Sequence, residues 1–225
     1  LGIPVDVFTR RTDPLAPETS EICPGVTVIM IPAGPPAPVD KNELFTYLPE
    51  FAENMALYAL KNGVRYDVVH AHYWLSGWVA QLLKRYWDTP FVHMFHTLAH
   101  MKNAVSPASQ RETALRSRIE RQLIDLADAL IAANPAERAD LIWRQHTPAD
   151  KICTIPPGVD VELFTPRNQE LSRRLIHPEL RGNVITFVGR VDPIKGIDTL
   201  LNVAAILAQR DIPFTVVFVG GDLDA

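Results

Sequence analysis

Two cations lie five residues apart in the stretch VGRVDPIKGID, residues 188–198. Arg190 follows an apolar run that predicts a strand, and Lys195 and Gly196 precede a run that predicts a helix. The start of a helix offers unpaired backbone N–H groups and the positive end of the helix dipole, to which side-chain cations add. The alternative is a solvated loop in which Lys195 pairs with a neighbouring aspartate. The placement between strand and helix favours an anion site that takes a phosphate.

Five of the seven histidines fall between residues 70 and 100. His70 and His72 end one predicted strand, His93 and His96 end the next, and His100 follows. Imidazole is a common zinc ligand, but the sequence has neither an HExxH motif nor a cluster of cysteines or acidic residues beside these histidines. We therefore predict no metal site, and a zinc hydrolase is the least favoured class. The pattern favours a polar rim that binds hydroxyl groups, with His96 as the first candidate; histidines with a structural role are the alternative.

Short β-branched runs alternate with amphipathic runs, which predicts an α/β fold with a parallel sheet and helices on both faces. Pro49 lies inside one predicted helix and predicts a kink or a break into two pieces. Asn134 and Pro135 are typical of a helix start. Strands are predicted at residues 5–8, 26–31, 66–72, 90–96 and 128–134, and residues 151–160 are predicted as a strand that runs into a Pro-Gly turn. Helices are predicted at residues 41–63, 74–87, 111–127 and 135–145. Ligands of such sheets bind beyond the carboxyl ends of the strands, where the histidines and Arg190 are expected.

The alternation breaks at residues 161–182 and restarts with a strand, a helix and a strand. We predict a first domain at residues 1–160, a connector at 161–182, and the start of a second Rossmann-like domain at 183–225. The chain opens with Leu1 rather than Met, and nothing after its last predicted strand would cover that strand. We therefore expect an internal fragment of a longer protein.

One predicted helix carries several charges, most of which we expect on a solvated face. Arg116 and Glu120 are spaced i to i+4, so they could pair with each other. The other charges on this helix include Arg118 and Arg121.

Composition excludes several classes of protein. The net charge of −4 and the absence of a long basic run argue against nucleic-acid binding. No apolar stretch of the sequence is long enough to span a bilayer, so we expect no integral membrane segment, and the first residues lack the pattern expected of a signal peptide. Two cysteines do not make a disulfide framework, which favours a reducing, cytoplasmic location.

Four segments resemble the retaining GT-B glycosyltransferases of family 4: HAHYWLSGWVA, HTLAHMKN, IPPGVDVELFTP and FVGRVDPIKGIDTLL. Within that family, HYWLSG together with HTLAHMKN is most similar to the D-inositol-3-phosphate glycosyltransferases of mycothiol biosynthesis. The sucrose-phosphate synthase group is the nearest alternative. The resemblance implies two Rossmann-like domains that face a cleft, the first holding the acceptor and the second the nucleotide sugar.

The resemblance also implies roles for particular residues. Arg190 and Lys195 match the pair that binds the donor diphosphate and offsets charge on the leaving UDP. His96 matches the histidine near the transferred sugar, and these three are the implied catalytic residues. Four further positions match those that hold the acceptor phosphate: Lys41, Tyr73, Thr97 and Arg116.

The implied reaction is transfer from a UDP-sugar, first UDP-N-acetylglucosamine, to a phosphorylated polyol such as 1D-myo-inositol 3-phosphate. The alternatives are transfer of glucose to fructose 6-phosphate and a non-catalytic nucleotide-sugar-binding module. The resemblance implies no required cofactor; magnesium on the acceptor side stays open, as does a homodimer. The family's glycine-rich loop and paired glutamates fall outside the sequence, so we expect this chain to be inactive by itself.

Overall fold

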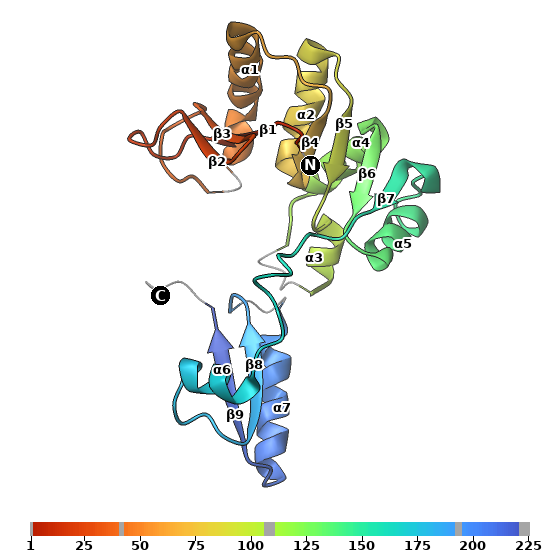
Figure 1. Ribbon diagram of the computed structural model, residues 1–225. Coiled ribbons are helices and arrows are strands. Elements are labelled where there is room, and N and C mark those ends of the chain that lie inside the picture. The colour runs from red at the N-terminus through yellow and green to blue at the C-terminus, as the bar shows by residue number, and fades with distance from the viewer. Residues whose placement is uncertain (1, 41–42, 106–110, 192–194, 221–225) are drawn as a thin grey trace. The chain divides into compact units, whose positions relative to one another are not determined.

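The computed structural model describes residues 2–40, 43–105, 111–191 and 195–220, which divide into two compact units (Figure 1). Unit 1 comprises Leu1–Ala99 and Thr113–Pro156, and unit 2 comprises His100–Glu112 and Pro157–Ala225. The predicted first domain ends near the end of unit 1, and the predicted connector at 161–182 falls within unit 2.

Unit 1 contains two sheets built from the β-branched runs of the sequence. In the first, of order β1-β3-β2, β1 (Val5–Arg10) is parallel and β2 (Thr19–Cys23) antiparallel to β3 (Val26–Ile31). The second is wholly parallel, with its strands in the order β4 (Val69–His72), β5 (Phe91–Met94), β6 (Ala129–Ala132) and β7 (Ile152–Thr154). Since His72 pairs with Met94, the carboxyl ends of β4 and β5 lie side by side.

Helix α2 belongs to both cores of unit 1. Its residues Val79 and Leu83 join a cluster with Ile29 of β3, and its Trp74 joins a second cluster with Phe91 of β5. This packing fixes the first turn of α2, which follows directly from the carboxyl end of β4. The helices that begin in unit 1 are α1 (Leu44–Asn62), α2 (Tyr73–Trp87), α3 (Ala99–Val105), α4 (Ala114–Leu126) and α5 (Pro135–Trp143), with a 3₁₀ turn at Ala149–Lys151.

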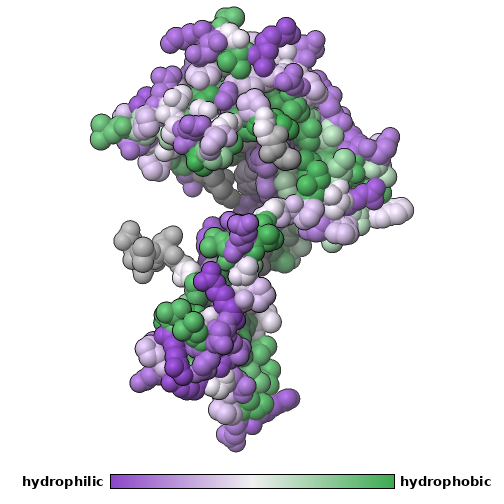
Figure 2. All heavy atoms as spheres, in the orientation of Figure 1, coloured by the Kyte–Doolittle hydropathy of each residue, from purple (hydrophilic) through white to green (hydrophobic). Residues whose placement is uncertain are grey.

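Unit 2 contains a parallel pair of strands, β8 (Asn183–Val188) and β9 (Phe214–Val219), joined through α7 (Ile197–Gln209). Among its described residues, Leu180 is the one buried hydrophobic side chain. The apolar residues of α7 are largely open to solvent, and Figure 2 shows hydrophobic surface over this helix. Unit 2 thus presents a strand–helix–strand motif with little core of its own.

The structure confirms the α/β fold with a parallel sheet, and also the predicted start of α5, where the Asn134 side chain accepts a hydrogen bond from the Glu137 N–H. Of the kink or break predicted at Pro49, the break is wrong, because α1 runs through Pro49 as one helix. Proline removes one N–H near the start of α1, and the packing of Ala52 and Met55 below it holds the helix together. Pattern reading missed β2, α3 and α6 (Gln169–Ile176), the last inside the predicted connector. Within the described ranges, no helix is long and apolar enough to cross a membrane.

Candidate functional site

The candidate site of unit 1 lies where β4 and β5 end. Tyr73 directly follows β4, and His96 and Thr97 follow β5. Tyr73 and His96 both have left-handed backbone angles, with φ of 72° and 61°. Such angles cost a non-glycine residue about 1–3 kcal/mol and persist only where the surroundings hold them. The structure therefore stores backbone strain at two of the predicted site residues, a frequent property of functional sites.

Three exposed imidazoles gather at this edge of the sheet. The Nδ1 atom of His72 lies 2.8 Å from the Nε2 atom of His96, and the ring centres of His70 and His72 are 4.1 Å apart. Partial burial lowers the pKa of His72, and the neighbouring His70 and His96 lower it further. Burial, then His96, likewise lowers the pKa of His70. The charged forms of His70 and His72 are thus disfavoured. No group of three or more histidines, cysteines or acidic residues in the described part of the chain is arranged to hold a metal ion.

His93 does not belong to this polar rim. Its side chain is fully buried, and burial lowers its pKa to about 3, so the ring is neutral in the folded protein near pH 7. Neither ring nitrogen has a partner of normal hydrogen-bond geometry within the described ranges. The ring packs against Gly77 of α2, where a Cβ atom would lie 2.6 Å from its Cε1 atom. His93 is therefore a core residue, as the structural alternative for these histidines supposed, while His100 lies in unit 2.

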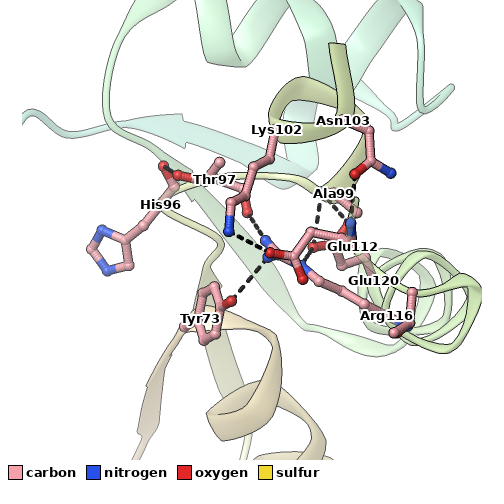
Figure 3. A network of polar contacts seen from close by, with 10 residues as sticks. Tyr73, His96, Thr97, Ala99, Lys102, Asn103, Glu112, Arg116 and Glu120 are labelled. Atoms are coloured by element: carbon pink, nitrogen blue, oxygen red, sulfur yellow. Dashed lines mark hydrogen bonds and ion pairs between the residues drawn. The ribbon is translucent and has the colours of Figure 1, made fainter. Parts of the chain in front are cut away.

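Arg116 connects three elements around the site (Figure 3). Its side chain is 1% exposed, and its Nη1 atom donates to the Tyr73 hydroxyl at 2.9 Å. Its Nη2 atom donates to the Thr97 carbonyl at 2.5 Å. The guanidinium also lies over the Tyr73 ring, 4.7 Å from its centre. Three of the four residues that the sequence matched to an acceptor-phosphate site are therefore joined by direct contacts. The fourth, Lys41, lies outside the described residues.

Glu120 holds Arg116 from the other side. Its carboxylate accepts from Arg116 Nε at 2.7 Å and from the backbone N–H of Ala99 at 2.9 Å. The pairing at i to i+4 is confirmed, whereas the expectation of a solvated face fails for these two residues and holds for the exposed Arg118. A buried pair is stable only when its polar atoms are hydrogen-bonded, and this one is. Sequence reading missed the contact to Ala99, because nothing in the pattern links residues that are 21 positions apart.

The Thr97 hydroxyl already has a hydrogen-bond partner within the chain. Its hydroxyl donates to the carbonyl of His96 at 2.7 Å. To donate to a ligand, this hydroxyl must rotate away from that carbonyl. The Tyr73 hydroxyl, in contrast, accepts from Arg116, so its own proton can point to a ligand.

The predicted anion site lies in unit 2. Gly189, with φ of 154°, links β8 to Arg190, and Lys195 precedes Gly196, the N-cap residue of α7, with φ of 75°. The side chains of Arg190 and Lys195 are exposed. Gly196 has no side chain with which to cap α7, so within the described residues it leaves the first backbone N–H groups of the helix, directly after Lys195, without a side-chain cap from the N-cap position. Residues 192–194 of the loop, including Asp192, lie outside the described residues.

Comparisons with known proteins agree on one family. Residues 1–163 match the model of Glycosyltransferase Family 4. The D-inositol 3-phosphate glycosyltransferase of Corynebacterium diphtheriae is 43% identical over 214 residues, which cover 93% of this chain and 50% of the relative. That of Corynebacterium jeikeium is 41% identical over 230 residues, covering 100% of this chain and 55% of the relative. The chain thus spans about half the length of the curated relatives it matches.

Among solved structures, the sucrose-phosphate synthase of Thermosynechococcus elongatus superposes with a TM-score of 0.84 at 33% identity. This match covers 100% of the chain and 54% of that protein. Anabaena HepE, solved in complex with UDP and glucose, superposes with a TM-score of 0.66 at 16% identity, covering 98% of this chain and 62% of HepE, a likeness of fold alone.

Proposed function

Because this chain belongs to glycosyltransferase family 4, we propose that the protein of which it is part transfers a sugar from a UDP-sugar to a phosphorylated polyol. The proposed acceptor is 1D-myo-inositol 3-phosphate, and the proposed donor is UDP-N-acetylglucosamine. The observation that carries the proposal is the network that joins Tyr73, Thr97 and Arg116 beyond the ends of β4 and β5. The names of the relatives at 40–43% identity support the choice of acceptor.

The acceptor phosphate is proposed to bind through donors that Arg116 holds in place. Glu120 offsets most of the charge of Arg116, so Arg116 contributes fixed geometry more than net positive charge. The Tyr73 hydroxyl, which accepts from Arg116, donates its proton to a phosphate oxygen. Lys41, outside the described residues, is proposed to supply the cation.

The donor diphosphate is proposed to bind at Arg190, Lys195 and the start of α7. In the reaction, the bond between the anomeric carbon and the diphosphate oxygen breaks, and a hydroxyl oxygen of the acceptor forms the new bond and loses its proton. UDP leaves with the negative charge that the two cations and the helix N-terminus offset. His96 is proposed to contact the transferred sugar. The proposed reaction needs no metal.

A second acceptor, fructose 6-phosphate with UDP-glucose as donor, is favoured by one observation. The sucrose-phosphate synthase structure superposes over the whole chain with a TM-score of 0.84. Both acceptors carry a phosphate, so the Tyr73–Arg116 network by itself suits either.

UDP release by the full-length protein tests the proposal, with each of the two donors paired with each of the two acceptors. Release with UDP-N-acetylglucosamine and inositol 3-phosphate alone is expected. Release with UDP-glucose and fructose 6-phosphate alone would replace the proposed acceptor by the second one. If no UDP were released with any of the four pairs, glycosyl transfer to either acceptor would be refuted and the non-catalytic binding module favoured.

A further inference from the structure

His72 and His96 form a hydrogen-bonded pair across two strand ends. The Nδ1 atom of His72 and the Nε2 atom of His96 are 2.8 Å apart, and their rings stack with centres 5.1 Å apart and planes at 23°. This distance is within the normal range for a hydrogen bond. Because each neutral imidazole has one donor and one acceptor nitrogen, one ring donates and the other accepts.

The side chain of His72 bonds to His96, although its position at the start of a helix would suit a residue that caps the helix. His72 is the N-cap residue of α2, where a side chain commonly accepts a hydrogen bond from the first turn. Histidine is not among the preferred capping residues, and its side chain makes no such bond here. The ring turns instead to His96, so the contact is made at the expense of a helix cap.

The surroundings keep the pair in its hydrogen-bonded form near neutral pH. The titratable groups that face His72 are His70 on β4 and His96 after β5, and both oppose a charge on it. The positive end of the α2 dipole, at the same helix start, opposes that charge as well. Since the folded-state pKa of His72 is lowered, the neutral ring is the stable form at pH 7.

The backbone of His96 adds a second constraint. Its φ of 61° is a left-handed angle that is uncommon for residues other than glycine. The hydrogen bond to His72 occupies Nε2, which leaves Nδ1 as the nitrogen that can meet a substrate. The tautomer of His96 is then set by whether His72 donates or accepts.

We propose that His72 is a positioning residue, which fixes the ring orientation and tautomer of His96 so that His96 presents Nδ1 to the transferred sugar. The inference rests on the proposed function, in which His96 contacts that sugar. It adds a residue to the site that the family resemblance did not include.

The test compares His72→Phe with His146→Phe in the full-length protein. Phenylalanine keeps an aromatic ring in the stack and removes both nitrogens, so His72→Phe isolates the hydrogen bond. His146 is the matched control, because it is an exposed histidine of unit 1 that lies between α5 and β7, away from the carboxyl ends of β4 and β5. The first readout is long-range ¹H–¹⁵N NMR of the histidine rings, with the His96 signals assigned by their loss in His96→Asn. The second readout is kcat and KM for UDP release.

The expected result is that His72→Phe changes the tautomer signature of His96 and lowers kcat about 3- to 10-fold, the factor that a hydrogen bond of ordinary strength contributes. The KM for the acceptor is expected to stay unchanged, and His146→Phe is expected to leave both readouts unchanged. An unaltered His96 signature in His72→Phe would overturn the inference, as would an altered signature with an unaltered kcat. An inactive wild-type protein would refute the proposed function and the positioning role with it, while the NMR readout would still report on the hydrogen bond by itself.

Discussion

The substitution Gly77→Ala has two effects of opposite sign on the free energy of unfolding. In an exposed helix interior, alanine is more stable than glycine by about 1 kcal/mol. In α2, however, a Cβ atom at position 77 would lie 2.6 Å from His93 Cε1 and 2.6 Å from Leu123 Cδ1. Ordinary contacts between carbon atoms are about 3.5–4.0 Å, so both neighbours must retreat by about 1 Å.

Any retreat of these neighbours must displace other atoms of the core, which decides the sign. His93 and Leu123 are both fully buried, the first on β5 and the second on α4. Overpacking of a tight core costs about 1–3 kcal/mol, and clashes with two buried side chains place Gly77→Ala in the upper half of that range. After the helix-propensity gain, we expect a net loss of about 1–2 kcal/mol, or a Tm lower by about 2–8 °C.

The assay follows urea unfolding of the full-length protein by hydrogen exchange of peptides from α2 and β5, which reports on unit 1. Ser76→Ala is the matched control, because Ser76 is the exposed neighbour of Gly77 on the same helix, and a surface change there is expected to alter stability by less than about 0.5 kcal/mol. A Gly77→Ala protein as stable as the wild type, or more stable, would refute the close packing of α2 on His93.

Four further predictions concern the site and its surroundings. Arg116→Lys keeps a charge but loses the planar donors that hold the Tyr73 hydroxyl, so the KM for the acceptor is expected to rise about 10-fold or more. The control, Arg118→Lys on the exposed face of the same helix, is expected to leave this KM unchanged. If both substitutions changed the KM by the same factor, the role of the Arg116 network would be contradicted. Burial lowers the pKa of His93 to about 3 in the folded protein, whereas the pKa of an unfolded histidine is about 6.5. Between these two pH values the unfolded state binds one more proton than the folded state. The free energy of unfolding is therefore expected to fall by about 1.4 kcal/mol per pH unit as the pH drops from about 6.5 towards 3. Urea unfolding at pH 7 and pH 5 measures this slope, and an equal slope in His93→Leu would show that another group carries it. Arg190→Ala is expected to lower kcat by about 10²–10³-fold. If only the KM for the donor changed, the proposed role of Arg190 in stabilising the leaving group would be contradicted. Incubation with EDTA is expected to leave UDP release unchanged, and loss of activity that Mg²⁺ restores would contradict the metal-free proposal.

The sheet and its ligand edge could be read from the sequence because both depend on local pattern. Runs such as VTVIMI predict strands, and polar residues directly after them must lie at the carboxyl edge of a parallel sheet. For this reason the sequence predicts His72 and His96 at one edge, and the register of β4 with β5 brings the ends of these two strands together.

The sequence pattern could not predict which residues from distant parts of the chain contact each other in the fold. The sequence predicts a solvated face for most charges of the helix at residues 111–127, but the buried residues of α4 include Arg116 and Glu120. A charged pair enters a core only when other elements satisfy its hydrogen bonds, and those elements, at Tyr73, Thr97 and Ala99, are far away in the chain.

The histidines illustrate the same limit. The sequence groups His93 with His96 because both come near the end of one predicted strand. In the structure, His93 lies on β5 itself, whereas His96 lies in the loop that follows β5. His93 packs into the core against α2, whereas His96 turns to His72 through a left-handed backbone angle that no local pattern signals.

The most direct test of the central claim compares two acceptors that differ only in the phosphate. With the full-length protein and UDP-N-acetylglucosamine, kcat/KM is measured for 1D-myo-inositol 3-phosphate and for unphosphorylated myo-inositol. If the Tyr73–Arg116 network and Lys41 grip the acceptor phosphate, the phosphorylated acceptor is expected to be preferred by about 10²-fold or more, from at least two charge-assisted hydrogen bonds of about 1.5–3 kcal/mol each. The account also predicts that Tyr73→Phe narrows this preference. Equal kcat/KM values for the two acceptors would contradict the assignment of this site to the acceptor phosphate.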